Sequence, residues 1–475
     1  MDNADPRTSW PLPPRSTREW QDADAAHLLH PFTDPRALAH KGVRVITRAE
    51  GLHVWDSEGR RLFDAMSGLW CVNVGYGQEA LVEAAASQMR ELPYYNGFFQ
   101  TTTPAAVALA ERLAALSPGG MGHVFFCNSG SEANDTQVRL VRRYWDLMGQ
   151  PQRQVIISRV NAYHGSTLTA ASLGGMAAMH AQGGLPIPGI VHIDQPHAWL
   201  HREGAARGLS DEDFARLAAG WLEQKILSLG PESVAAFIAE PVQGAGGVVV
   251  PPASYWPEVQ RICERYGILL VSDEVICGFG RTGRWWGCET FGVQPDLVTF
   301  AKGVTSGYIP LGGVLVGDRV ARVLVEQGGE FEHGFTYSGH PVACAVALAN
   351  LDLIERLGLV ERVREDTGPY LASRLATLLD HPLVAQVDSC GLMAAIQLAR
   401  DPATRESFPA GLGVGLACRA HCFENGLVMR AVGDRMIVAP PLIITREQVD
   451  ELVTLARQAL DRTLAQARSS GWTDA

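Results

Sequence analysis

The chain has 475 residues, enough for one large domain and a smaller one, each with its own buried core. Hydrophobic residues make up 47% and charged residues 19%, a balance that excludes a largely disordered chain. The formal net charge of −11 disfavours a nucleic-acid-binding protein, because such proteins are more often basic.

The nine cysteines are scattered and include no CxxC pair, so we expect small buried thiols in a reducing compartment rather than disulfides or a metal site. The first residues, MDNADPRTSWPLPP, are polar and proline-rich and lack the layout of a signal peptide. No apolar run approaches the roughly 20 residues of a membrane helix. Together these features predict a cytoplasmic protein.

The N-terminal region, up to about Pro31, is predicted to be a flexible arm followed by a short helix. Residues 43–56, VRVITRAEGLHVWD, alternate in character around Glu50-Gly51, which predicts a β-hairpin. We assign residues 1–77 to this arm and to part of a small domain.

From about Gln78 the pattern changes to helices that alternate with short apolar strands. The predicted helices are ALVEAAASQMREL, AAVALAERLAAL, EANDTQVRLVRRYWDLM and WPEVQRICERY, and the predicted strands are HVFFCN, QVIIS, AAFIAEP, GILLVSDEV, LVTFAK and GGVLVG. Nearly all-apolar strands separated by helices predict a buried, mostly parallel sheet that helices cover on both faces. Residues 78–345 are therefore predicted to form the large domain of an α/β fold.

The pattern changes again after roughly residue 345. A long helical stretch, ACAVALANLDLIERL, is followed by predicted strands GLMAAIQL and MIVAPPLII and by a terminal amphipathic helix, REQVDELVTLARQALDRTLAQA. Residues 346–475 are predicted to form a second, smaller α+β domain.

Lysine is rare in this chain: only Lys41, Lys225 and Lys302 occur among 40 lysines and arginines. The first two fit solvated surface positions. Lys302 differs because it follows the apolar strand LVTFA, and α/β sheets bind ligands at the carboxyl ends of their strands. Burial would lower the pKa of its ammonium and make the amine nucleophilic, which arginine cannot become. The alternative is a strand-end lysine that reaches solvent.

Asp273 also ends an apolar strand, GILLVSDEV. A carboxylate there can pair with a protonated ring nitrogen and keep a pyridinium charged, so that the ring can accept electrons. The alternative is an acid that caps a helix or forms a salt bridge.

Two further segments fit a phosphorylated, planar cofactor. Ser129, Gly130 and Ser131 lie between a predicted strand and a helix, where free N–H groups and the helix dipole favour a phosphate, although a simple capping turn would look similar. Tyr163 and His164 follow the strand QVIIS, where an aromatic ring could stack on the cofactor. An isolated aromatic residue is more often part of the core.

The run Gly278 to Gly283 matches the G-x-G-x-x-G fingerprint of dinucleotide-binding folds. Its glycines come several residues after the strand ends, and the following RWWGCE does not resemble the helix that should begin there. We interpret this run as a turn at the rim of the site.

Taken together, the segments NSGSEAND, YHGST, EPVQGAGG, DEVICGFGRTG, AKGVTSGYIPLGG and FTYSGHPVACA occur in the order found in class III aminotransferases. The chain resembles this family from about His27 to its C-terminal helix. It is most similar to the ω-transaminases, or amine:pyruvate aminotransferases, including putrescine:pyruvate enzymes, whose features recur as SGLWCVNVGYG, YYNGFF, SGHPVACAVALAN and GLVMRAVGDRMIVAPPL.

The resemblance implies the type I fold of pyridoxal-phosphate-dependent transferases and pyridoxal 5′-phosphate as the cofactor. It also implies a ping-pong reaction in which a primary amine becomes an aldehyde or ketone and pyruvate becomes alanine. The donor could be an ω-amino acid such as β-alanine, taurine, a diamine or an aryl-alkyl amine.

The resemblance assigns roles to matching residues. Lys302 would bind the cofactor covalently and move the proton, and Asp273 would bind the ring nitrogen. Tyr163 would stack on one face of the ring and Val275 would pack on the other. The other residues expected at the cofactor are Ser129, Gly130, Ser131, His164 and Glu240, with Gly130 and Ser131 on the phosphate.

Substrate and partner contacts follow from the same resemblance. Trp70, Phe98 and Tyr163 would form the walls of the substrate pockets. Arg430 would move in to pair with the carboxylate of pyruvate or alanine and move out for an uncharged amine; the alternative is a surface arginine. Thr336 would reach the cofactor phosphate of the partner subunit, which implies a homodimer with shared active sites and leaves a tetramer open.

Two positions depart from the family pattern. Relatives that use α-ketoglutarate carry a fixed arginine where Ile437 stands, often paired with the residue matching Glu240, so pyruvate is the expected acceptor. Ile276 replaces a glutamine common among relatives, which leaves a contact to the phenolic oxygen of the cofactor open.

Three other functions fit parts of the pattern. An aminomutase or racemase of the same fold would need no amino acceptor. A non-enzymatic pyridoxal-phosphate-binding protein is disfavoured by the intact Lys302 and Asp273 and by the lack of an appended DNA-binding domain. A dehydrogenase would have to bind NAD.

Overall fold

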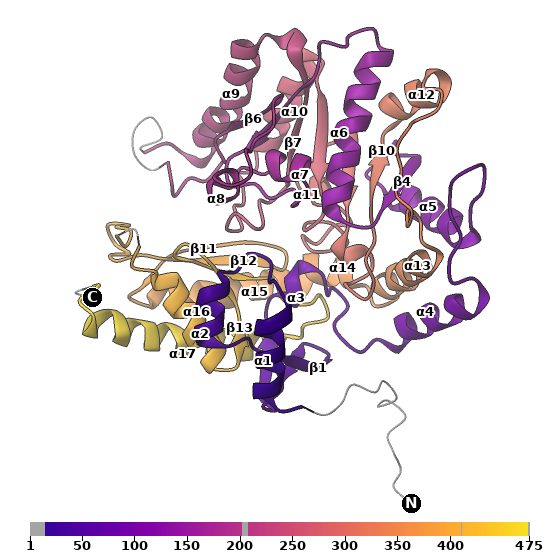
Figure 1. The fold of residues 1–475 in the computed structure, drawn as a ribbon. Coiled ribbons are helices and arrows are strands. Elements are labelled where there is room, and N and C mark those ends of the chain that lie inside the picture. The colour runs from indigo at the N-terminus through magenta and orange to yellow at the C-terminus, as the bar shows by residue number, and fades with distance from the viewer. Residues whose placement is uncertain (1–14, 202–207, 410, 474–475) are drawn as a thin grey trace, which may run out of the picture.

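The computed structural model describes residues 15–201, 208–409 and 411–473, and its largest element is a sheet of seven strands in the order β4-β10-β9-β8-β7-β5-β6 (Figure 1). The strands are β4 (His123–Cys127), β5 (Val155–Arg159), β6 (Ile190–Ile193), β7 (Val234–Ala239), β8 (Leu269–Asp273), β9 (Leu297–Phe300) and β10 (Gly312–Val316). Strand β10 is antiparallel to both of its neighbours, whereas the pairs from β9 to β6 are parallel. The predicted mostly parallel sheet is confirmed.

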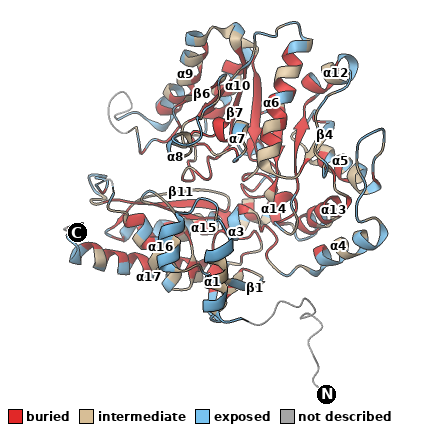
Figure 2. Ribbon diagram, in the orientation of Figure 1, coloured by how far each residue is buried: buried red, intermediate tan, exposed pale blue. Residues whose placement is uncertain are grey.

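Successive residues of the central strands contribute to two cores on opposite faces of this sheet, as the alternation of side chains along a strand requires. Val271 packs with residues of α6 (Gly130–Leu147) on one face, whereas Leu270 packs with α10 (Tyr255–Tyr266) on the other. Every residue of β7, β8 and β9 is buried, and Figure 2 shows the same burial along the sheet. Burial on both faces explains why these strands are nearly all apolar.

Most helices of this part of the chain lie around the sheet, whereas the first and the last of them pack against each other below it (Figure 1). The helices are α4 (Glu79–Glu91), α5 (Pro104–Leu116), α6, α7 (Leu168–Leu173), α8 (Ala177–His180), α9 (Asp211–Leu229), α10, α11 (Gly287–Thr290), α12 (Asp318–Gln327) and α13 (Pro341–Arg356). Gly267, in the left-handed conformation with φ 65°, ends α10 and leads directly into β8.

Two smaller sheets, each of four strands, lie below the large one in Figure 1. The first has the order β1-β2-β3-β13 and the second β11-β12-β15-β14. The strands are β1 (Ile46–Glu50), β2 (His53–Asp56), β3 (Arg61–Asp64), β11 (Val384–Cys390), β12 (Met393–Leu398), β13 (Leu427–Val428), β14 (Arg430–Val432) and β15 (Arg435–Val438). N-terminal and C-terminal segments thus share one sheet, because Phe63 of β3 pairs with Leu427 of β13.

The remaining helices flank the two smaller sheets. They are α1 (Thr17–His27), α2 (Pro35–Lys41), α3 (Ser67–Trp70), α14 (Leu359–Arg362), α15 (Gly368–Ala376), α16 (Val414–Glu424) and α17 (Arg446–Ser469). The predicted flexible arm falls largely on residues 1–14, outside the described residues, and the predicted short helix corresponds to α1. The domain boundaries at residues 77 and 345 stay predictions.

The predicted strand MIVAPPLII is shorter than its apolar composition indicates. Strand β15 ends at Val438, and no strand continues over residues 439–444. Pro440 and Pro441 follow, and proline lacks the N–H group that a sheet ladder needs.

All nine cysteines are free; Cys71 and Cys390 are partly exposed and the others are buried. In residues 15–201, 208–409 and 411–473, no group of histidine, cysteine, aspartate or glutamate side chains has the arrangement of a metal site. Within the same ranges, no helix is both long enough and apolar enough to cross a membrane.

Arg281 joins the loop after β8 to the smaller sheets. Its side chain is fully buried and donates hydrogen bonds to Asn73 Oδ1 at 2.8 Å, to Ser67 Oγ at 3.2 Å and to the carbonyl of Pro440. Burial lowers the pKa of Arg281 to about 10, so the guanidinium stays charged at neutral pH. One cation therefore satisfies polar groups from two segments that lie far from it in the sequence.

Replacing this cation should strongly destabilise the protein. We expect Arg281→Met to lower the free energy of unfolding by about 3 kcal/mol, because Asn73 Oδ1 and the Pro440 carbonyl would stay buried without donors. The midpoint of urea unfolding, followed by tryptophan fluorescence, measures the loss. Arg216→Met is the control, since its ion pairs with Glu212 and Asp213 are exposed and should leave the unfolding midpoint nearly unchanged. Equal midpoints for the two variants would contradict this role of Arg281.

Candidate active site

A cavity of about 330 Å³ lies where the carboxyl ends of several strands of the large sheet meet. Strands β8 and β9 end next to Asp273 and Lys302, and β7 leads to Glu240. Strands β4 and β5 lead to Ser129 and Tyr163. The sequence-predicted residues that line this one cavity are Ser129, Gly130, Ser131, Tyr163, His164, Glu240, Asp273, Val275 and Lys302.

Lys302 is held in an unusual backbone conformation at the wall of the cavity. Its φ is 48°, in the left-handed region that side-chain-bearing residues rarely adopt, and such strain concentrates at functional sites. Burial lowers the pKa of its amine, while the negative charge of Asp273 opposes that shift. Among the described residues the amine has no hydrogen-bond partner. A buried, unpaired amine with a lowered pKa can act as a nucleophile.

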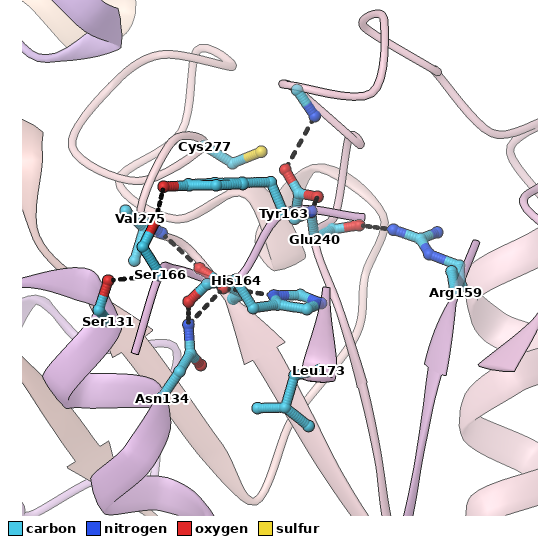
Figure 3. A network of polar contacts seen from close by, with 12 residues as sticks. Ser131, Asn134, Arg159, Tyr163, His164, Ser166, Leu173, Glu240, Val275 and Cys277 are labelled. Atoms are coloured by element: carbon cyan, nitrogen blue, oxygen red, sulfur yellow. Dashed lines mark hydrogen bonds and ion pairs between the residues drawn. The ribbon is translucent and has the colours of Figure 1, made fainter. Parts of the chain in front are cut away.

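Asp273 is fixed by three donors, from Asn134, His164 and Val275, and Figure 3 labels these three residues. Oδ2 accepts from Asn134 Nδ2 at 2.8 Å and from His164 Nδ1 at 2.6 Å, and Oδ1 accepts from the backbone N–H of Val275 at 3.0 Å. An ionised carboxylate only accepts, so the hydrogen of His164 is on Nδ1. The carboxylate therefore keeps one orientation at the cavity wall.

The N-terminus of α6 forms the anion-binding end of the cavity. Ser129 caps the helix by accepting from the Glu132 N–H at 3.2 Å, which leaves the N–H groups of Gly130 and Ser131 without helical partners. Ser131 Oγ accepts from the backbone N–H of Ser166 at 3.0 Å, so its hydroxyl hydrogen is available to a ligand (Figure 3). A phosphate fits these donors.

Two glycines keep this end of the cavity open. A Cβ on Gly165, which has φ +135°, would lie 2.5 Å from Ser131 Oγ, closer than any real contact. A Cβ on Gly130 would lie 3.0 Å from both methyl groups of Val275. Side chains at these positions would therefore displace the groups expected at the phosphate and at the ring.

Tyr163 and Glu240 also line the cavity and lie next to each other (Figure 3). One oxygen of Glu240 accepts from the Tyr163 N–H at 3.2 Å and the other from the Gly244 N–H at 2.9 Å. Burial raises the pKa of Glu240. The Tyr163 hydroxyl is 3.1 Å from Ser166 Oγ, which connects this side to the anion-binding end.

These groups fit the pyridoxal phosphate that the sequence predicts. The cavity combines a free amine on Lys302, a fixed carboxylate on Asp273 and an open helix N-terminus at Gly130. The buried Nε2 of His164 and Oδ1 of Asn134 have no partner in the described part of the chain.

Four predicted substrate and partner residues lie elsewhere. Trp70 is buried against Val242 and Ile276, and its neighbour Cys71 lines the cavity. Phe98 lines a different cavity, together with Gly334, and Thr336 is exposed. Arg430 begins β14 and interacts electrostatically with Lys302 and Tyr163. The cavity of one chain thus lacks Phe98 and Thr336, and their roles stay predictions.

Sequence reasoning missed several residues of the site. Asn134, which holds Asp273, follows Gly130 by one helical turn in the run NSGSEAND, so helix periodicity could have identified it. Arg159, which donates to the backbone carbonyl of Glu240, has no local signal. The run from Gly278 to Gly283 forms a tight turn, because Phe279 and Gly280 donate to the carbonyls of Trp285 and Arg284. Only the short helix α11 follows, unlike a dinucleotide-binding fold.

Comparisons with known proteins agree with this geometry. Residues 37–460 match the family model described as aminotransferase class-III. The chain is 58% identical to a putrescine–pyruvate aminotransferase from Pseudomonas aeruginosa over 94% of its own length and 97% of that protein. It is 44% identical to a diaminobutyrate–2-oxoglutarate transaminase from Halomonas elongata, over 93% of this chain and 95% of that protein.

Solved structures agree as well. An (S)-enantioselective ω-transaminase from Thermomicrobium roseum superposes with a TM-score of 0.91 at 44% identity and covers 95% of this chain and 100% of its own. An ω-transaminase from Pseudomonas jessenii in complex with PMP gives a TM-score of 0.91 at 42% identity, over 94% of this chain and 98% of its own. The predicted type I fold is confirmed, and the chain belongs to the class III aminotransferases, which use pyridoxal phosphate.

Proposed function

We propose that this enzyme transfers the amino group of a primary amine, with a diamine such as putrescine as the first donor to test, to pyruvate. The observation that carries the proposal is the state of Arg430: its guanidinium is more than half buried beside the cavity and, among the described residues, has neither a hydrogen-bond nor an ion-pair partner.

An unpaired cation in this place favours a carboxylate ligand. Burial lowers the pKa of Arg430, and nearby Arg419 adds to that shift. Desolvating a charge without a partner costs free energy, which a bidentate pair with a substrate carboxylate would offset. Pyruvate and alanine carry such a carboxylate, whereas a simple amine donor does not. Movement of the side chain would let one pocket accept both.

The surroundings of Ile437 support a small acceptor. Ile437 is fully buried in an apolar cluster with Trp70, Val242 and Ile276, so no cation is available there for a second carboxylate. Arg435, two residues earlier on the same strand, donates to the backbone carbonyls of residues 247 and 248 and to Asp388. The relative with 58% identity is named for putrescine and pyruvate, which also supports this choice.

Each residue at the cavity would have a separate role in the reaction. Bound pyridoxal phosphate supplies a ring that accepts electrons from the substrate carbon. Lys302 would anchor the cofactor and then move the proton at the reacting carbon, and Asp273 would hold the ring nitrogen in its protonated state. Tyr163 and Val275 would confine the ring, and Gly130 and Ser131 would bind the phosphate.

We also propose a homodimer with shared active sites. Exposed aromatic side chains gather around the segments that carry Phe98 and Thr336: Tyr95 is 50% exposed, Phe99 90% and Tyr337 57%. Tyr94 connects the two segments, since its hydroxyl donates to the Thr336 carbonyl at 2.7 Å. Large exposed aromatic groups in one region are typical of a subunit interface. Light scattering coupled to size-exclusion chromatography tests this, and a monomeric mass would contradict it.

The reaction itself is tested by visible absorption of the purified protein. Putrescine should bleach the yellow colour of the bound cofactor, and pyruvate should restore it with formation of one alanine for each amino group transferred. An aminomutase or racemase would convert its substrate without forming alanine from pyruvate. A protein that stays colourless when pyridoxal phosphate is supplied would overturn the proposal.

Arg430→Ala separates the two half-reactions. We expect the variant to use pyruvate and alanine about 100-fold less efficiently in kcat/KM, which corresponds to losing a charge-assisted bidentate pair of about 3 kcal/mol. The putrescine half-reaction, followed by stopped-flow absorbance, should change by less than about threefold. Arg419→Ala, at a neighbouring exposed arginine, is the control. Equal losses in both half-reactions would rule out the proposed role.

A further inference from the structure

The connection between α12 and α13, residues 328–340, is bound to α6 by arginine side chains of that helix. Arg143 donates to the carbonyl of Gly328 at 2.6 Å, and Arg139 donates to the carbonyl of Glu332 at 2.9 Å. This connection carries Thr336, and α6 carries Gly130 and Ser131 at its N-terminus. Two segments proposed to bind phosphate are therefore linked.

His333 is the side chain at the centre of this link. Its Nδ1 lies 2.9 Å from Arg139 Nη1 and its Nε2 lies 2.8 Å from Thr136 Oγ1. A guanidinium can only donate, so Nδ1 accepts from Arg139 and the hydrogen on Nε2 is donated to Thr136. Burial and the charge of Arg139 both lower the pKa of His333, in agreement with a neutral ring.

Aromatic side chains hold the ring in this orientation. The imidazole stacks on Phe125 of β4, with a centroid distance of 5.4 Å and an interplanar angle of 15°. Phe331 and Phe335 contact it edge-on at 5.4 Å and 5.1 Å. Packing on three rings and two hydrogen bonds leaves His333 one orientation, although it lies in a connection without regular secondary structure.

Thr336 follows His333 by three residues and is held on its other side by Tyr94. Its side chain is exposed and does not line the cavity of its own chain. The contacts of His333 therefore order a segment whose threonine does not line its own cavity. Ordering this segment costs conformational entropy, and a contact of Thr336 with a second chain would offset that cost.

We propose that His333 is a positioning residue that holds Thr336 for the cofactor phosphate of the partner subunit. The effect acts between subunits: His333 of one chain sets how tightly the other chain keeps its cofactor. This inference rests on the proposed homodimer, and the experiment below separates a failure of the one from a failure of the other.

The test uses hybrid dimers of one unaltered chain and one His333→Ala chain, prepared by co-expression with two different affinity tags and purification on both. Cofactor is removed by dialysis, and samples are treated at intervals with borohydride, which fixes the remaining cofactor permanently to Lys302. Intact-protein mass spectrometry weighs the two chains separately, since tags and substitution give them different masses.

We expect the unaltered chain of the hybrid to lose its cofactor about tenfold faster than in the unaltered homodimer, while the His333→Ala chain keeps the unaltered rate. The opposite pattern would mean that His333 acts on its own site through α6, and equal rates would mean that it does not affect the phosphate; either result overturns the proposal. A protein that forms no dimers would instead refute the proposed assembly.

Further variants keep the test decisive if His333→Ala folds poorly. Thr136→Val removes the contact on α6 and should give the same pattern in trans, with a smaller rate change. His333→Gln can accept from Arg139 and donate to Thr136, so it should restore most of the retention. Thr336→Ala is the positive control, and His123→Ala, at an exposed histidine of β4, should leave both rates unchanged.

Discussion

Lys302→Ala should reduce kcat for transamination by at least about 1,000-fold, because the variant would lose the residue that we propose as the covalent anchor and as the base that moves the proton. The structure offers no substitute amine: Lys302 is the one lysine that lines the cavity in the described part of the chain. Burial lowers the pKa of its amine, which favours the uncharged, nucleophilic form. Arginine at this position should be equally inactive, since its guanidinium stays protonated.

Single-turnover absorbance with putrescine measures this loss, and borohydride followed by mass spectrometry measures the covalent anchor directly. Both signals should disappear in Lys302→Ala, whereas Lys225→Ala, on α9, should keep both. The donors at Gly130 and Ser131 that we propose for the phosphate remain, so the variant should still bind the cofactor non-covalently. A Lys302→Ala protein that retains more than about a tenth of the unaltered rate would remove the lysine from the mechanism.

The large sheet could be predicted from the sequence because its strands are apolar on both faces. Strand β7 reads VAAFIA and every residue is buried, so local composition alone identifies it. Strand β11 was missed because it reads VAQVDSC and all but one of its residues are only partly buried. Strand β6, at the edge of the sheet, has four residues and was missed as well.

Long-range pairing could not be read from local patterns. Strand β13 has two residues and exists because Leu427 and Val428 pair with Phe63 and Asp64, more than 300 residues earlier in the chain. Strand β14 depends in the same way on β15. No periodicity is measurable over two or three residues, so tertiary contacts alone define these strands.

Residues of the candidate site could be predicted where a reactive side chain directly follows the end of a strand. Lys302 and Asp273 were identified because a charged residue directly after a buried apolar strand is unusual, and the structure places both at one cavity. Of the three donors that orient Asp273, His164 and Val275 were predicted as cofactor contacts, whereas Asn134 was not. Cys71 and Arg281 were not identified either. Cys71 lines the cavity from a segment outside the large sheet, so no strand end indicates it. Arg281 binds a backbone carbonyl, a group that every residue carries and that no sequence motif marks.

Asp273→Asn should lower kcat by about 100- to 1,000-fold while the protein keeps its cofactor. The pyridine nitrogen would lose the negative partner that keeps it protonated, so the ring would accept electrons less readily. The amide also fits the surroundings poorly. Asn134, His164 and the Val275 N–H all donate to the carboxylate, and an amide offers one oxygen and an NH₂ group that would face a donor.

Two measurements separate this catalytic role from a structural one. The rate of the putrescine half-reaction should fall in Asp273→Asn while the rate of cofactor loss on dialysis rises by less than about tenfold, because the phosphate contacts are intact. Ser131→Ala should show the reverse, with faster cofactor loss and a nearly unchanged half-reaction when cofactor is in excess. Asp146→Asn, the same substitution at an exposed position of α6, is the control. If Asp273→Asn loses its cofactor as its main defect, the carboxylate anchors the ring more than it activates it, and the electron-accepting role must be assigned to other groups around the cavity.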